Sequence, residues 1–262
     1  MVMHMEHNIA YYHAIQGLNG CASRKDANIR KAKRRIYRDW KKNWDWEQVV
    51  ILNADGAPRE QDLKILQTAL KTEKKIKTRP DELLRLGEIV KWRDTVWLVR
   101  ELDPDNKIQY SGNMNQCSLL LRWKLEDGSV HEEYAQAEDA SKYGSGANAS
   151  DYMSVPYFTV KIRVPVNEHT MSIDRDKRFL LGQIGQGKLR PFRLTRVNDV
   201  VYRYYYEDGE QKGSGYLEWT MTEDFEHAGE DDHEEGIAKN TAIPKELPEW
   251  TPPEDQQYGG WF

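Results

Sequence analysis

From residue 87 onward the chain alternates short apolar runs, rich in Trp, Val and Leu, with turn-forming residues at intervals of about ten residues. The first run, residues 87–99, is followed by a Pro-Asp-Asn turn at 104–106 and a second run at 112–123. Many short runs of this kind, without intervening helices, predict an all-β fold. We therefore expect a mainly β body, a small β-barrel or sandwich, over residues 83–221, between extended N- and C-terminal arms.

The large apolar side chains of these runs are the expected core. Each lies within a strand-like segment, where a buried side chain stabilises the fold and does not contact a ligand. The residues assigned to the structural core are Trp92, Trp97, Cys117, Trp123 and Phe179. The second cysteine, Cys21, lies in a Gly-rich stretch, so we expect two reduced thiols, with a disulfide as the alternative.

Further strands are expected on both sides of turn signals in the second half of the chain. A Glu-Asp-Gly-Ser turn at 126–129 predicts a hairpin between residues 119–125 and 130–137. A Gly/Ser/Ala-rich stretch at 142–150 is typical of a loop. The remaining expected strands are residues 157–164, 177–181, 192–197, 200–206 and 216–221.

A basic helix is expected ahead of the body, within an N-terminal segment of residues 1–47. Residues 24–42 hold ten Lys/Arg against two Asp, and the apolar residues recur at helical spacing over 26–46, with Asp26 as the expected cap. A basic face can contact DNA phosphates or an acidic partner, although a solvated face is the alternative. The candidate contact residues are Arg30, Lys33, Arg34 and Lys41.

Residues 48–82 are expected to connect this helix to the body. A short strand is predicted at 49–52, before an Asn-Ala-Asp-Gly turn. Residues 62–77 have a helix-forming composition, with Leu63, Leu66 and Leu70 at helical spacing, but a paired strand remains open.

The last segment, residues 222–262, is an acidic, Pro- and Trp-rich tail with twelve Asp/Glu against two Lys. We expect its run 231–235 to be solvated, and deletion of 236–262 to leave the body folded. The aromatic residues near the end are candidate anchors for pockets on a partner, with packing on the chain's own body as the alternative. These residues are Trp250, Trp261 and Phe262.

No arrangement typical of catalysis or of metal binding emerges. Residues 182–188 match the Gly-x4-Gly-Lys spacing of a phosphate-binding loop, but Leu189 replaces the Ser or Thr that would hold magnesium, so a hairpin loop is expected. The acidic residues at 231–235 are consecutive, unlike those of a calcium loop, and Asp174 with Asp176 is typical of a charged turn. We expect no enzymatic activity, no cofactor and no metal.

Composition sets the general class. The hydrophobic share is 39% and the mean hydropathy is −0.85, which indicates a modest core with segments that need partners. The apolar runs all fall short of the ~20 residues of a membrane helix, and the N-terminus does not resemble a secretion signal, so we expect a protein without a membrane partner, made in the cytoplasm.

Three stretches together resemble a family of neck proteins from tailed phages that infect Gram-positive bacteria. They are residues 87–99 (Gly-Glu-Ile-Val-Lys-Trp-Arg-Asp-Thr-Val-Trp-Leu-Val), 112–123 (Gly-Asn-Met-Asn-Gln-Cys-Ser-Leu-Leu-Leu-Arg-Trp) and 174–181 (Asp-Arg-Asp-Lys-Arg-Phe-Leu-Leu). The resemblance covers about residues 26–235 and includes the basic helix. Residues after 243 depart from the family pattern. The family's motifs are apolar and structural.

The resemblance implies a head-closure (stopper) or head–tail connector protein in the virion neck. Such subunits form homo-oligomeric rings of six or twelve copies around the channel through which packaged DNA passes. Their partners are the portal or adaptor protein on one side and tail-side neck proteins on the other. The alternatives are a nucleic-acid-binding β-barrel module and another minor head or tail structural protein, with a hydrolase as a weaker rival.

Overall fold

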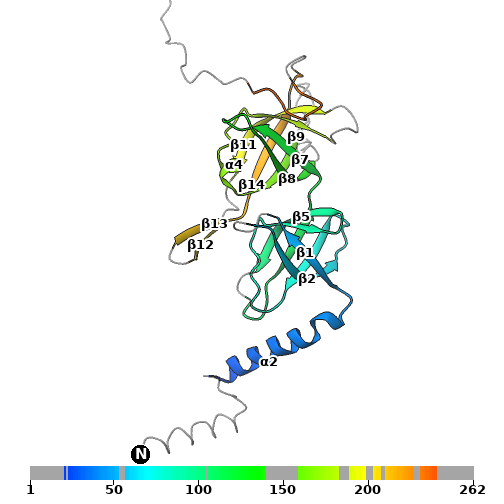
Figure 1. Ribbon diagram of the computed structural model, residues 1–262, viewed down its shortest axis with the longest axis vertical. Coiled ribbons are helices and arrows are strands. Elements are labelled where there is room, and N and C mark those ends of the chain that lie inside the picture. Colours follow the sequence, from blue (N-terminus) through cyan, green and yellow to red (C-terminus); the bar gives the residue numbers. More distant parts are fainter. Residues whose placement is uncertain are drawn as a thin grey trace, which may run out of the picture.

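A computed structural model gives the structure of the chain. It describes residues 21, 23–52, 57–103, 106–139, 159–182, 189–198, 203–207, 210–226 and 231–240. The described chain is mainly β, as predicted, with two six-stranded sheets, a two-stranded ribbon and a basic helix (Figure 1). The expected loop at 142–150 and the expected arms at 1–20 and 241–262 lie outside the described residues.

The basic helix α2 (Arg24–Asp39) continues into a 3-10 turn, η1 (Trp40–Lys42). Its N-cap is Ser23, whose hydroxyl accepts a hydrogen bond from the Asp26 N–H; the prediction of Asp26 as the cap was therefore wrong by one turn. The helix also ends earlier than residue 46, because Trp46 already pairs with Lys64 in the first strand.

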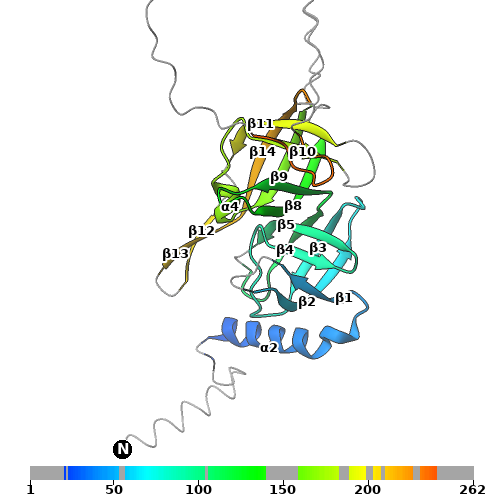
Figure 2. The ribbon, with the colours of Figure 1, turned by 45° about the horizontal axis from the view of Figure 1, so that its top comes forward.

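The first sheet is a closed barrel with the strand order β1-β2-β3-β6-β5-β4, in which every neighbouring pair is antiparallel. Its strands are β1 (Trp46–Ile51), β2 (Arg59–Gln67), β3 (Glu73–Thr78), β4 (Ile89–Trp92), β5 (Thr95–Asp103) and β6 (Ser111–Gln116). Helix α2 lies across the end of this barrel that is remote from the second sheet (Figures 1 and 2).

Residues 62–77, for which helix and strand both remained open, belong to β2 and β3. Along β2, Leu63 and Ile65 are buried while their neighbours are more exposed, a period of two that places alternate side chains in the barrel interior. Leu70, which the helical spacing required on an apolar face, is 61% exposed in the turn between the strands. The barrel therefore begins at Trp46 and not at residue 83.

The second sheet has the order β10-β11-β14-β9-β8-β7. Its strands are β7 (Leu119–Lys124), β8 (Val130–Asp139), β9 (Thr159–Pro165), β10 (Arg178–Leu181), β11 (Arg190–Asn198) and β14 (Tyr216–Glu223). The two edge strands approach one another, and the ring of Trp123 on β7 meets that of Phe179 on β10 edge-on, with 5.9 Å between centroids. The sheet thus curls around one apolar core.

Three of the five predicted core residues are fully inside. Trp97 is 3% exposed, Trp123 2% and Phe179 0%. Trp92 and Cys117 are only half-buried. Trp92 lies against Trp97 with 5.9 Å between ring centroids, and the Arg93 guanidinium lies over the Trp92 ring at 5.0 Å from its centroid. Both cysteines are free thiols, as expected.

The two sheets meet at a small apolar cluster formed by Leu86, Ile89 and Leu98 from the barrel and Tyr216 from the second sheet. Gly87 lies at this junction with φ of +83°, and a Cβ on it would lie 1.7 Å from the carbonyl oxygen of Gly215. The backbones of the two units therefore touch where only glycine fits.

Two smaller elements complete the described chain. Strands β12 (Arg203–Glu207) and β13 (Glu210–Ser214) pair into a ribbon that projects to one side (Figure 2). The short helix α4 (Glu168–Met171) is capped by Asn167, whose side chain accepts from the Thr170 N–H.

Candidate interaction surfaces

Helix α2 presents a basic face to solvent. Its apolar residues Ile29, Ala32 and Ile36 are half-buried and lead to Trp40, which is 1% exposed. The opposite side carries Lys31, Arg34 and Arg38, because residues that differ by about 180° around a helix face opposite ways. The exposed cations of α2 and η1 together are Arg24, Lys25, Arg30, Lys31, Arg34, Arg35, Arg38, Lys41 and Lys42.

The C-terminal half of the helix is fastened to the barrel. Lys33 pairs with Asp81, and the Tyr37 hydroxyl donates to the Pro80 carbonyl. The ring of Trp40 lies beneath the ammonium of Lys64, at 5.2 Å, and the guanidinium of Arg79, at 5.8 Å. Of the predicted contact residues, Lys33 therefore makes a contact within the chain.

The four predicted contact residues are therefore not equivalent. Lys33 is half-buried and engaged with Asp81, and Lys41 lies over the Trp46 ring at 4.9 Å and 4.0 Å from Asp62. Arg30 is exposed, with its guanidinium 4.0 Å from the Cys21 sulfur. Arg34 is exposed on the outward face. Of the four, Arg34 is placed best for a partner.

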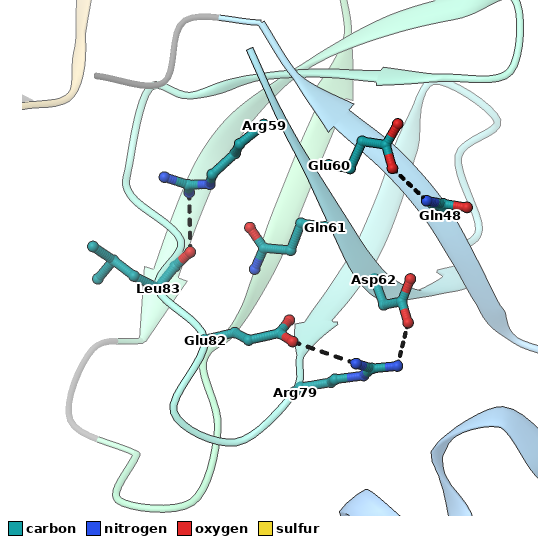
Figure 3. Close-up of a pocket in the computed structure, with 8 residues that line it drawn as sticks. All are labelled: Gln48, Arg59, Glu60, Gln61, Asp62, Arg79, Glu82 and Leu83. Atoms are coloured by element: carbon teal, nitrogen blue, oxygen red, sulfur yellow. Dashed lines mark hydrogen bonds and ion pairs between the residues drawn. The ribbon is translucent and has the colours of Figure 1, made fainter. Parts of the chain in front are cut away.

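A polar hollow of about 500 Å³ opens on the barrel wall beside η1 (Figure 3). Strand β2 supplies one side and the segment between β3 and β4 supplies the other. The lining residues are Gln48, Arg59, Glu60, Gln61, Asp62, Arg79, Glu82 and Leu83. Sequence reasoning missed this site. The one sign of this hollow in the sequence is Gln61, a polar residue at a position of β2 where the alternation of side chains predicts a buried one.

Ion pairs and hydrogen bonds hold most of these side chains in place (Figure 3). The Arg79 guanidinium bonds to Asp62 and lies 3.7 Å from the Glu82 Oε1 atom. Arg59 donates to the Leu83 carbonyl at 3.0 Å and to the buried Glu88 carboxylate at 2.9 and 3.1 Å. Both guanidinium groups thus bond to fixed acceptors, although the buried Nε atom of Arg79 has no hydrogen-bond partner among the described residues.

Three side chains in the hollow, Gln61, Arg79 and Glu82, keep unused hydrogen-bonding capacity. Gln61 is 9% exposed, yet among the described residues neither its Oε1 nor its Nε2 atom makes a hydrogen bond of normal geometry. The buried Oε2 atom of Glu82 has no partner there either. Burial, together with the negative charge of Asp62, raises the pKa of Glu82, although the charge of Arg79 and the nearby Gln61 side chain oppose the shift. The hollow therefore holds two buried acceptors, Gln61 Oε1 and Glu82 Oε2, and two buried donors, Gln61 Nε2 and Arg79 Nε, with this unused capacity.

The acidic segment after β14 is partly buried, contrary to the expectation of a solvated run. Asp231, 9% exposed, forms a two-pronged ion pair with Arg178 at 2.9 and 3.0 Å. Arg178 also bonds to Asp224 at 3.0 Å. Four of the five residues of the run 231–235 are acidic, and one of their carboxylates neutralises a buried arginine of β10.

Residues 231–240 lie across the seam between the two edge strands of the second sheet. The Asn240 side chain accepts from the Arg178 N–H at 2.6 Å and donates to the Arg178 carbonyl at 3.1 Å, and Arg122 of β7 donates to the Glu235 carbonyl. Ala238 packs on Leu180. A deletion from residue 236 would remove the contacts of Ala238 and Asn240 with β10, and the expectation that the body stays folded without residues 236–262 stays a prediction. Trp250, Trp261 and Phe262 lie outside the described residues.

A group of titratable side chains lies beside α4. The rings of His131 and His169 are 4.3 Å apart, and the His131 ring also packs on Trp123 at 4.6 Å. Burial raises the pKa of Glu133 to about 7, although Asn167 donates to its carboxylate at 2.5 Å. Burial, and then the charge of His169, lowers the pKa of His131.

Other candidate chemistry finds no support in the described part of the chain. Strands β10 and β11 are antiparallel neighbours, so the Gly-rich segment between them connects a hairpin, as predicted, and no helix follows it. Within the described ranges no three ligating side chains are placed to hold a metal ion, and no helix is long and apolar enough to cross a membrane. Burial raises the pKa of the Cys117 thiol to about 12, so it carries no thiolate at neutral pH.

Comparison with known proteins adds no family. No family model matches the sequence, and no curated protein matches it. Among solved structures, one described as "MrkH, A novel c-di-GMP dependence transcription regulatory factor" aligns with a TM-score of 0.23 and 8% identity, over 76% of this chain and 85% of that chain. A TM-score of this size does not show a shared fold, so nothing about this chain follows from it.

Proposed function

We propose that this chain is a non-enzymatic structural protein of a tailed-phage neck, a head-closure or head–tail connector subunit that forms a ring between the portal or adaptor protein and the tail. The observation that carries the proposal is the resemblance of three stretches, 87–99, 112–123 and 174–181, to that family. In the fold these stretches coincide with Gly87 and the β4–β5 hairpin, with the passage from β6 to β7, and with β10.

The positions of the three stretches give each of them a structural role. The first contains the glycine at the junction of the two sheets, the second runs from the barrel into the second sheet, and the third supplies the edge strand that the strap covers. The residues that carry the resemblance are structural. This fits a protein that functions by assembling with other subunits and not by catalysing a reaction.

The basic helix supports the same proposal. Its outward cations can contact packaged DNA in the channel or an acidic surface on a neighbouring protein, and either contact is screened by salt. In this proposal the protein acts in the virion after assembly in the host cytoplasm.

The test is deletion of the gene from the phage that encodes this chain. We expect heads that package DNA but lose it or fail to join tails, and infectivity that returns when the chain is supplied in trans. A deletion phage that makes normal, infectious particles would overturn the proposal.

A second function, a nucleic-acid-binding β-barrel module, is favoured only by the outward basic face of α2. It predicts that the purified monomer binds DNA with an affinity that falls steeply with salt. Substitution of Arg34 and Lys31 by Glu would then weaken DNA binding by tenfold or more, whereas a neck subunit would show weak binding in isolation.

A further inference from the structure

A cleft of about 480 Å³ lies beside helix α2, and we call it the α2 cleft. Its lining comes from α2, from the turn after η1 and from strands β2 and β3 of the barrel wall. Arg35 of α2, Lys64 of β2 and Lys77 of β3 all contribute to this lining. Three cations from three elements therefore share one space, and none of them was predicted as a contact residue.

Two carboxylates line the same cleft, and each has a cation beside it. Arg38 and Lys42 donate hydrogen bonds to Asp39 at 3.2 and 3.0 Å, and they also offset the negative end of the α2 dipole. Asp45 lies 3.5 Å from the Lys64 ammonium, although its buried Oδ1 atom makes no hydrogen bond among the described residues. The carboxylates of the cleft are thus neutralised by these three cations.

The other two cations of the lining are left without a carboxylate. In the described part of the chain, Arg35 and Lys77 have no ion-pair partner. Lys77 is half-buried and lies directly opposite Lys64 in the register of β2 and β3, where like charges destabilise a sheet. The Lys64 side chain is only 15% exposed, and its ammonium is held over the Trp40 ring. An anion in the cleft would offset this repulsion.

The free donors indicate the kind of anion. Arg35 offers a planar fork of N–H groups and Lys77 three N–H donors, and the Gln109 side chain adds a neutral amide to the lining. A phosphate monoester carries about −1.5 to −2 charges at pH 7 and three acceptor oxygens, so it can neutralise both cations at once. A carboxylate or a chloride ion carries a single charge. Half-buried Ile36 and Leu66 add apolar surface beside these donors.

We propose that the α2 cleft binds a doubly charged phosphate, held between the Arg35 guanidinium and the Lys77 ammonium. The ligand is either inorganic phosphate or the terminal phosphate of a small organic compound, and separate probes distinguish these two sources. A bound phosphate would join α2 to the barrel wall, because its partners come from both. The site is formed by a single chain and does not rest on the proposed function.

The experiment compares the full-length wild type with two matched pairs of variants. Arg35→Gln removes a lining cation, and Arg34→Gln removes its neighbour on the outward face of α2. Lys77→Gln removes the lining lysine, and Lys75→Gln removes an exposed lysine on the same face of β3 that lies outside the lining. Isothermal titration calorimetry with sodium phosphate, against sodium chloride of equal ionic strength, measures anion binding.

We expect the wild type to bind phosphate saturably and more tightly than chloride. Arg35→Gln and Lys77→Gln should each weaken phosphate binding at least tenfold, whereas Arg34→Gln and Lys75→Gln should change it less than twofold. In low-salt chloride, Lys77→Gln should have a higher thermal midpoint than Lys75→Gln, because it removes the charge opposite Lys64. Phosphate should then raise the midpoint of the wild type more than that of Lys77→Gln.

Adenosine monophosphate distinguishes the two sources. If the apolar part of the lining holds an organic group, adenosine monophosphate binds at least tenfold more tightly than inorganic phosphate. If the two bind alike, the ligand is the free phosphate ion. Both results support the site, and adenosine without its phosphate should not bind in either case.

Three results would overturn the inference. The first is a wild type that binds phosphate no more tightly than chloride. The second is an outward variant, Arg34→Gln or Lys75→Gln, that weakens phosphate binding as much as its partner in the lining, because the anion would then respond to general positive charge. The third is a short DNA duplex whose binding depends on Arg35 and Lys77 while phosphate does not compete with it. Arg35 is exposed on a helix, so its variant decides the test even if Lys77→Gln fails to fold.

Discussion

Gly87 of the barrel and Gly215 of the second sheet touch through their backbones, so that a Cβ on Gly87 would lie 1.7 Å from the Gly215 carbonyl oxygen. That oxygen also accepts a hydrogen bond from the Val166 N–H at 3.1 Å and cannot move freely. Gly87 opens the first of the three stretches that resemble the neck-protein family. The contact explains why a glycine is needed there: it permits the close approach of the two β units.

This contact gives the first prediction. Gly87→Ala should lower the free energy of unfolding by at least about 2 kcal/mol more than Gly128→Ala. Both glycines have φ of +83°, so both variants carry the same backbone strain, but a Cβ on Gly128 would meet nothing within 4 Å. Urea unfolding of the two variants measures the difference. Equal losses would mean that the two sheets do not meet at Gly87.

The second prediction separates the two tryptophans of the β4–β5 hairpin. Trp97→Ala should cost about 3–5 kcal/mol, because the side chain is 3% exposed, and Trp92→Ala should cost less than half of that because its ring is half-buried. Denaturant unfolding of both variants is the measurement. If Trp92→Ala proved the more costly, its assignment to the barrel surface would be wrong.

The third prediction concerns the strap. Asp231→Ala removes a carboxylate that neutralises the buried Arg178 guanidinium. We therefore expect the free energy of unfolding to fall by about 3–5 kcal/mol. Glu234→Ala, in the same acidic run but exposed, should change stability by no more than about 0.5 kcal/mol. Equal effects of the two substitutions on the thermal midpoint would show that the strap does not stay on the seam.

The fourth prediction is a dependence of stability on pH. Folded Glu133 keeps its proton up to about pH 7, whereas an unperturbed glutamate loses it near 4.5, so the folded state binds more protons between these values. The free energy of unfolding therefore falls as pH rises through that window. His131, whose pKa is lowered, acts in the opposite direction.

Glu133→Gln isolates the carboxyl contribution, because Gln keeps an acceptor for Asn167 and leaves the histidines in place. The wild type should lose up to about 3 kcal/mol relative to this variant between pH 4.5 and 8. Chemical unfolding at several pH values provides the test. Parallel pH profiles for the two proteins would rule out a raised pKa at Glu133.

The strand content could be predicted from the sequence because turn signals and short apolar runs are local. The limits of β7 and β8, for instance, agree with the predicted hairpin within two residues at each end. The stretch 62–77 could not be assigned, because Leu63 and Ile65 fit the strand period while Leu63, Leu66 and Leu70 fit the helical one. Pairing of β2 with β1 and β3 decides between them, and that pairing is not local.

The sites depend on contacts that a single sequence does not display. Asp231 is one acid in an acidic run, and only its Arg178 partner, 53 residues earlier, distinguishes it. The hollow likewise joins β2 to the segment after β3, and its key residue is a glutamine with no motif around it. The basic helix was predictable from composition, but its anchoring through Trp40 was not. The two cations over that ring come from distant parts of the sequence, Lys64 from β2 and Arg79 from the segment after β3.

The most direct test of the proposed function is a cryo-electron microscopy reconstruction of the virion in which that proposal places this chain. We expect a ring of this protein at the junction of head and tail, around the DNA channel, with six or twelve copies. Density for this chain elsewhere in the particle, or a neck that does not contain it, would contradict the account.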